Sequence, residues 1–133
     1  MKKLLIALGC IVVVCVAGFL VFRMKIQEML KYYREYSVKN IDLKSIPDGV
    51  YHGSCKVFVV AADVEARIQD HRISDIKMIK QQCGGKAYTG TQVIDRVLKE
   101  QSLGVDAVAG ATASSKCILI ALERAFTAGP SKP

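Results

Sequence analysis

The sequence predicts an α+β fold: a small antiparallel β-sheet covered by two helices and preceded by an N-terminal transmembrane helix. Three observations lead to it. An uncharged apolar run fills Leu4–Phe22, strand patterns occupy residues 50–80, and two stretches with helical apolar spacing follow Thr91. With 133 residues, the chain is long enough for one modest domain besides the apolar run. The expected parts are an anchor (1–23), a juxtamembrane helix or stalk (24–46), a folded domain (47–128) and a tail (129–133).

The N-terminal apolar run has the length of a membrane span. Its 19 residues reach roughly 28 Å, close to the thickness of a bilayer core. A cleaved signal peptide is the alternative, but the run is long for one and ends in the bulky residues Phe19–Phe22. Lipoprotein processing at Cys10 is a second alternative, disfavoured because little apolar sequence precedes it. We therefore expect an uncleaved anchor.

Positive charge gathers beside this anchor. Residues 1–39 hold seven Lys or Arg and two Glu, whereas residues 40–133 hold twelve Lys or Arg and ten acids. Anionic headgroups attract such a basic segment, and the nearly neutral remainder predicts no nucleic-acid binding. Lys and Arg lie on both sides of the anchor, so charge alone does not decide its orientation.

The five cysteines predict no metal site. Cys10 and Cys15 lie in the apolar run, and Cys55, Cys83 and Cys117 show no CxxC spacing. We interpret the last three as buried structural thiols. One disulfide among them is the alternative if the domain faces an oxidising compartment.

The elements of the folded part follow from turn signals and periodicity. The Pro47–Gly49 turn opens the domain after a helical juxtamembrane stretch (24–37). Three sequential strands predict an antiparallel meander. We place them at Val50–Ala62, Val64–Gln69 and Ile73–Lys80, with a tight connection at Asp70–Arg72. A loop (Gln81–Gly90), a helix capped by Thr91 and ending near Gln101–Gly104, an extended link (Val105–Ala111) and a helix from Thr112 or Ala113 to about Ala128 complete the domain.

The segment Asp106–Ser115 carries the chemistry. It reads as a strand end, a glycine turn at Gly110 and a helix N-terminus with three hydroxyls, where free N–H groups and the helix dipole favour a phosphate. Ser114 and Ser115 could add hydrogen bonds to phosphate oxygens. However, Thr112 and Ser114 are also ordinary N-cap residues, so helix capping explains the same segment.

The wider pattern of residues 47–128 resembles a known family. The matching segments are Asp48–Gly53, Ile73–Ile76, Gly85–Ala87, Asp106–Ser115 and Ala121–Phe126, in this order. They are similar to the FMN-binding domain found in the C subunit of the sodium-translocating NADH:quinone oxidoreductase, in the G subunit of the Rnf complex and in many small anchored proteins.

The resemblance implies a covalent cofactor site. In that family the last residue of the motif Asp-x-x-Ser/Thr-Gly-Ala-Thr/Ser is esterified to FMN by an extracytoplasmic, magnesium-dependent flavin transferase that uses FAD as donor. Carried over, Thr112 is the acceptor, Asp106 the acid of the motif, and Gly110 and Ala111 its turn. Ala109 departs from the pattern, because the family usually has a hydroxyl there.

The resemblance also implies a place and a role. The domain is expected outside the cytoplasmic membrane, as an electron-transfer flavoprotein rather than a complete enzyme, with Tyr88 a candidate contact for the flavin ring. Redox partner proteins or quinol-linked donors would supply electrons, and magnesium would act only during flavin transfer. Two alternatives remain. One is a subunit of a larger membrane oxidoreductase, and the other is a non-redox module that has lost the flavin, which the departure at Ala109 favours.

Overall fold

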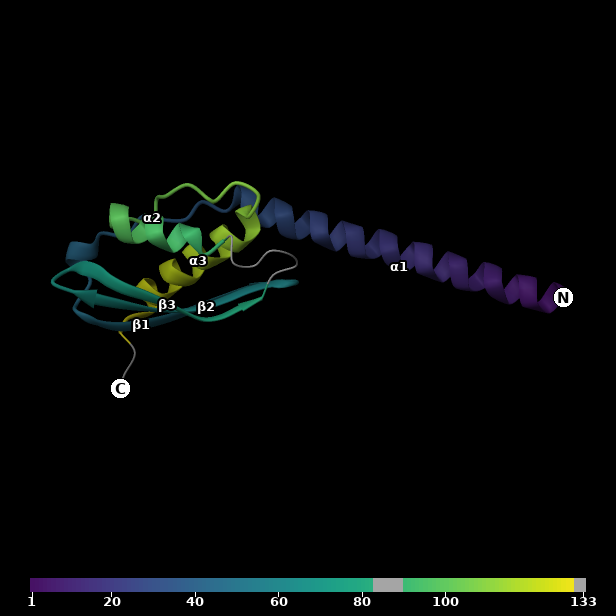
Figure 1. Cartoon of the computed structure of the whole chain (residues 1–133), viewed down its shortest axis with the longest axis horizontal. Helices are drawn as coiled ribbons and strands as arrows, with labels where there is room; N and C mark the ends of the chain where they lie inside the picture. The colour runs from purple at the N-terminus through teal and green to yellow at the C-terminus, as the bar shows by residue number, and fades with distance from the viewer. Residues whose placement is uncertain (83–89, 131–133) are drawn as a thin grey trace.

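The computed structural model describes residues 1–82 and 90–130. Its elements in chain order are α1 (Lys2–Glu35), the 3-10 turn η1 (Leu43–Ser45), β1 (Gly49–Val57), β2 (Val60–Gln69), β3 (Arg72–Gln82), α2 (Gln92–Glu100) and α3 (Thr112–Ala128). The strands form one antiparallel sheet in the order β1-β2-β3, and the first helix projects from the folded part as a long rod (Figure 1). The predicted α+β class with two further helices and an N-terminal apolar helix is confirmed.

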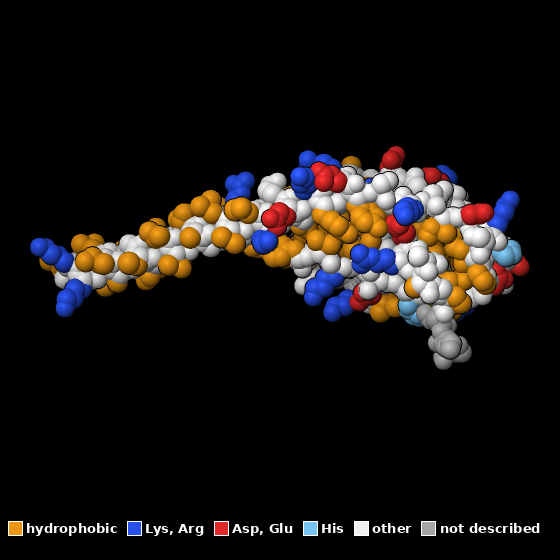
Figure 2. Space-filling view, turned by 180° about the vertical axis from the view of Figure 1, so that it is seen from behind, with side chains coloured by type: hydrophobic (Ala, Val, Ile, Leu, Met, Phe, Trp, Pro, Cys, Tyr) orange, Lys and Arg blue, Asp and Glu red, His pale blue; other side chains and the backbone are white. Residues whose placement is uncertain are grey.

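Helix α1 serves two environments along its 34 residues. It is long and apolar enough to cross a membrane, and its hydrophobic side chains from Leu4 to Phe22 are exposed. Figure 2 shows Lys and Arg at its free end and where it meets the domain. Beyond Phe22 an apolar stripe continues at helical spacing, and two of its members, Met29 and Tyr33, are buried in the core. The end of the anchor helix is therefore part of the folded domain.

The sheet buries one face and exposes the other. In β2 every second side chain is buried, from Val60 to Ile68, while Glu65, Arg67 and Gln69 point to the opposite face. This confirms the predicted alternation. Helix α3 covers the buried face across β1 and β2 (Figure 1).

Helix α3 lies unusually close to β1 because of one glycine. A Cβ atom at Gly53 would collide with the carbonyl oxygen of Ala121 and would stand 2.8 Å from the Cβ of Ala125. The central residues of α3, from Cys117 to Leu122, are all buried. This contact fixes α3 on the sheet, and with it the position of the helix N-terminus.

The first turn of the sheet differs from the prediction. We expected the first strand to run to Ala62, but β1 ends at Val57 and Phe58 and Val59 form the turn. Phe58 takes φ 53°, in the left-handed region where glycine or asparagine is usual. An all-apolar turn contains no glycine, proline or asparagine to mark it, so the predicted strand was extended across it. The tight connection at Asp70 and His71 was placed correctly.

Candidate functional site

Helix α3 begins without a side-chain cap. Its N-cap residue is Ala111, and the first helical hydrogen bond runs from the Ser115 N–H to the Ala111 carbonyl at 2.9 Å. The N–H groups of the three residues between them have no backbone acceptor in the described part of the chain. The capping alternative for Thr112 and Ser114 is therefore not realised, and the helix N-terminus is open to a ligand.

Thr112 is the first residue of α3 and is exposed. Within residues 1–82 and 90–130 its hydroxyl has no hydrogen-bond partner. The preceding turn is tight, since the Ala111 N–H donates to the Val108 carbonyl at 3.0 Å. Gly110 takes φ 78°, which a residue with a side chain rarely adopts. The glycine of the motif is thus required by backbone conformation.

Two side chains hold this turn from either side. The buried Ser115 hydroxyl accepts a hydrogen bond from the Val108 N–H at 3.1 Å. Arg96, from α2, donates to the Asp106 carbonyl at 2.8 Å. Because neither interaction uses the Thr112 hydroxyl, the turn is fixed while that hydroxyl stays available.

A cavity of about 440 Å³ opens beside Thr112. Three parts of the chain wall it: the end of α1, the start of β2 with the turn before it, and the first turn of α3. Apolar side chains form most of the surface. The lining residues are Ile26, Met29, Leu30, Val59, Val60, Gly110, Ala111, Thr112, Ala113 and Ser114.

The predicted site residues divide into three groups. Gly110, Ala111, Thr112 and Ser114 line the cavity. Asp106 and Ala109 are exposed and lie outside its lining, and Ser115 is buried behind it. Tyr88 lies outside the described residues.

The sequence pattern missed the rest of the cavity. Ile26, Met29 and Leu30 had been interpreted only as a juxtamembrane stretch, and Val59 as part of a strand. The spacing of the three α1 residues, i, i+3 and i+4, was a signal for one buried helix face, but it did not say what the face contacts. Arg96 was missed because binding carbonyl groups leaves no pattern in sequence.

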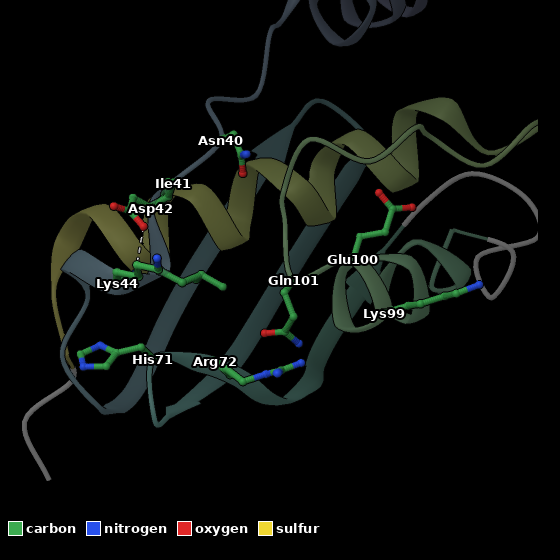
Figure 3. Close-up of a pocket in the computed structure, with 10 residues that line it drawn as sticks. Asn40, Ile41, Asp42, Lys44, His71, Arg72, Lys99, Glu100 and Gln101 are labelled. Atoms are coloured by element: carbon green, nitrogen blue, oxygen red, sulfur yellow. Dashed lines mark hydrogen bonds between the residues drawn. The ribbon is translucent and has the colours of Figure 1, made fainter.

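A second, larger cavity lies at the other end of the sheet. It measures about 750 Å³ and is lined by polar side chains, among them Asp42, Lys44, His71, Arg72 and Lys99 (Figure 3). Many of its polar groups are already bonded within the protein. Gln101, for example, accepts a hydrogen bond from the Ile73 N–H at 2.8 Å and donates to the Leu98 carbonyl at 2.7 Å. Asn40, Asp42 and His71 are bonded in the same way, whereas the side chains of Lys44, Arg72, Lys99 and Glu100 have no partner in the described part of the chain.

The described thiols of the folded part also serve the core. Cys55 and Cys117 are free and buried, and the Cys117 thiol donates to the Cys55 carbonyl at 3.3 Å. A side-chain interaction with the Cys117 thiol lowers the pKa of Cys55 to about 7, and the same interaction together with burial raises the pKa of Cys117. Neither thiol lines the cavity beside Thr112. No group of three or more His, Cys, Asp or Glu in the described ranges is arranged to hold a metal ion.

Comparison with known proteins gives one match. The sequence model of a family described as FMN-binding domain matches residues 51–127, more than half of the chain. The matched region includes the cavity-lining residues from Val59 to Ser114 and excludes those of α1. No match was found among curated proteins or among solved structures.

Proposed function

The chain belongs to the FMN-binding domain family, and on that premise we propose that it is a membrane-anchored, extracytoplasmic flavoprotein that carries FMN through a phosphoester to Thr112 and acts in electron transfer. The observation that carries this proposal is the exposed Thr112 hydroxyl, which stands at an uncapped helix N-terminus on the wall of an apolar cavity.

The first turn of α3 fits a phosphate diester. Backbone N–H groups that lack intrahelical acceptors point out of a helix N-terminus, and the helix dipole favours negative charge there. A phosphate esterified to Thr112 would lie within reach of the N–H groups of Ala113 and Ser114. Attachment and electrostatic stabilisation thus come from the same turn.

The cavity walls fit a planar aromatic ring. Ile26, Met29, Leu30 and Val60 offer apolar surface, which suits a flavin ring better than water does. The departure at Ala109 does not count against this fit, because Ala109 lies outside the cavity lining. A missing hydroxyl there removes no contact from the cavity.

Thr112 supplies one bond in the attachment step. Its Oγ1 forms a new ester bond to the phosphorus on the FMN side of FAD, the diphosphate bond of FAD breaks, and AMP leaves. The hydroxyl proton is released, and no electron changes hands. A flavin transferase and its magnesium ion act in this step only, so the chain needs no metal site of its own.

The protein then acts as a carrier. FMN, when bound, takes up and releases one or two electrons. The chain's own residues attach the cofactor at Thr112, fix the turn through Ser115 and Arg96, and confine the domain to the membrane through α1. Redox proteins or quinol-linked donors in that membrane are the proposed partners.

Intact mass of the full chain, coexpressed with a flavin transferase, tests the proposal. The expected gain is the mass of one FMN less one water. Thr112→Ala should be unmodified and Thr112→Ser should keep the adduct, because serine supplies the same nucleophile. Thr127→Ala, a threonine change near the other end of α3, is the matched control and should be fully modified.

Two results would contradict the assignment. One is an unmodified wild-type chain, which would favour the non-redox alternative. The other is an adduct that survives Thr112→Ala. Flavin fluorescence in a denaturing gel separates covalently attached from noncovalently bound flavin, since noncovalent FMN is lost on denaturation.

A further inference from the structure

The turn between β1 and β2 is apolar and meets the anchor helix. It consists of Phe58 and Val59, with Val57 before it. Phe58 is 45% exposed, and its ring centroid lies 5.8 Å from that of Phe22. An exposed phenylalanine ring is unfavourable in water. Its setting therefore favours an apolar or interfacial surrounding.

Phe22 marks the depth of this turn. It is the last residue of the uncharged run, and Arg23 and Lys25 follow it. Because charged side chains lie outside the hydrocarbon core, Phe22 is placed at the boundary between the acyl chains and the headgroups. Because Phe58 contacts Phe22, the turn reaches the same boundary.

The same reasoning gives the depth of the cavity. Ile26 and Leu30 follow Phe22 by four and eight residues, which is roughly 6 to 12 Å along a helix. The headgroup layer on each side of a bilayer is about 5 to 8 Å thick. The cavity therefore begins within this layer, with Val59 of the apolar turn on its wall.

Figure 1 agrees with this arrangement. The turn between β1 and β2 and the start of α3 lie at the end of the domain from which α1 leaves, and the turn between β2 and β3 lies at the other end. The end of the domain with the cavity is thus the end next to the anchor.

We infer that residues 57–59 enter the headgroup layer beside the anchor, so that the Thr112 cavity opens at the membrane surface. The surface that contacts lipid consists of Phe22, Phe58 and the turn around them. This inference rests on the proposed function for the membrane anchor and the flavin, and it adds what that function leaves open: where the cofactor is held.

The chain contains no tryptophan, which makes a clean probe possible. Phe58→Trp places a single tryptophan in the apolar turn. Gln69→Trp places one at an exposed position at the far end of β2 and is the matched control. Each full-length variant is reconstituted into vesicles whose lipids carry a nitroxide in the headgroup or high on the acyl chain.

The tryptophan at position 58 should lose most of its emission to these lipids and should emit at shorter wavelength than the one at position 69, which should keep its emission. In the flavin-loaded chain, headgroup nitroxides should also reduce flavin fluorescence. Inserting seven helical residues after Arg23 lifts the domain by roughly 10 Å and should restore both signals.

Equal emission from the two tryptophans, or flavin fluorescence untouched by headgroup nitroxides, would overturn the inference. The tryptophan measurement needs no flavin. Failure of attachment at Thr112 therefore shows in the mass of the chain, and failure of the membrane position shows in the quenching.

Discussion

The two ends of the sheet use their polar groups in opposite ways. At the anchor-side end, comprising the β1–β2 turn and the first turn of α3, the helix N-terminus has no side-chain cap and the Thr112 hydroxyl has no partner in the described part of the chain. At the far end, comprising η1, the β2–β3 turn and Gln101, several polar groups bind one another. Asp48, for example, accepts hydrogen bonds from the N–H groups of Asp70 and His71 at 2.9 and 3.2 Å.

This difference indicates which of the two cavities is the better ligand site. The far-end cavity is the larger, at about 750 Å³ against about 440 Å³. Yet Asn40, Asp42, His71 and Gln101 on its wall are committed to the fold, whereas the smaller cavity combines apolar walls with uncommitted backbone donors. A ligand gains most where donors lack partners, because no internal bond must first be broken.

The largest expected effect is on flavin attachment, when a negative charge is introduced at one end of the sheet or at the other. Ala113→Glu places a carboxylate beside the open N–H groups, where it stabilises the helix but repels a phosphate. We expect flavin attachment to fall more than about tenfold, since like charges in contact cost several kcal/mol. Arg72→Glu in the far cavity should leave attachment unchanged. Flavin per chain in a denaturing gel measures both. An equal loss of flavin in both variants would contradict the assignment of the site to the anchor-side end.

Neighbouring serines on α3 should differ in stability. Ser115→Ala leaves the buried Val108 N–H without its acceptor and should lower the free energy of unfolding by about 2 kcal/mol. Ser114→Ala removes a hydroxyl with no partner in the described residues and should change it by less than about 0.5 kcal/mol. Urea unfolding of both variants in one detergent gives the values. A larger loss for Ser114→Ala would mean that the open hydroxyl is structural.

The far end should respond in stability but not in flavin content. Gln101→Leu keeps the bulk of the side chain and removes its hydrogen bonds to Ile73 and Leu98. The expected loss is about 1 kcal/mol, with full flavin attachment. Lys99→Ala, at an exposed neighbouring position, is the control and should be near neutral. Reduced flavin in Gln101→Leu would show that the two ends are coupled.

The smallest effect concerns acid stability at the far end. The N–H groups of Asp70 and His71 hold the pKa of Asp48 below its usual value. The stability from this carboxylate is therefore present above its unfolded pKa and is lost as pH falls through the folded pKa. Asp48→Asn should lower the thermal midpoint slightly at neutral pH, with the difference shrinking in acid. Asp75→Asn, the same change at an exposed acid on β3, is the matched control, and the thermal midpoint of each variant is measured against pH.

Strong local signals made most elements predictable. Helix α3 begins at Thr112 and ends at Ala128 as expected, because glycines flank a helical apolar stripe. The alternation in β2 gave its buried face, since only one side of the sheet is covered. The predicted position of the first turn was wrong because Phe58 carries no turn signal of its own, and the ring that it contacts, Phe22, is distant in sequence.

By itself, the sequence determined the elements, the apolar anchor and the motif around Thr112, since each depends on residues close together in the chain. The tertiary structure decided which donors stay open and what faces them. The same sequence is compatible with a capped and with an open helix N-terminus. The structure is open because the N-cap position falls on Ala111, which has no side-chain acceptor. The cavity joins α1, the turn before β2 and α3, which meet because Gly53 lets α3 approach the sheet and because Met29 and Tyr33 are buried against it. No local pattern encodes such a meeting.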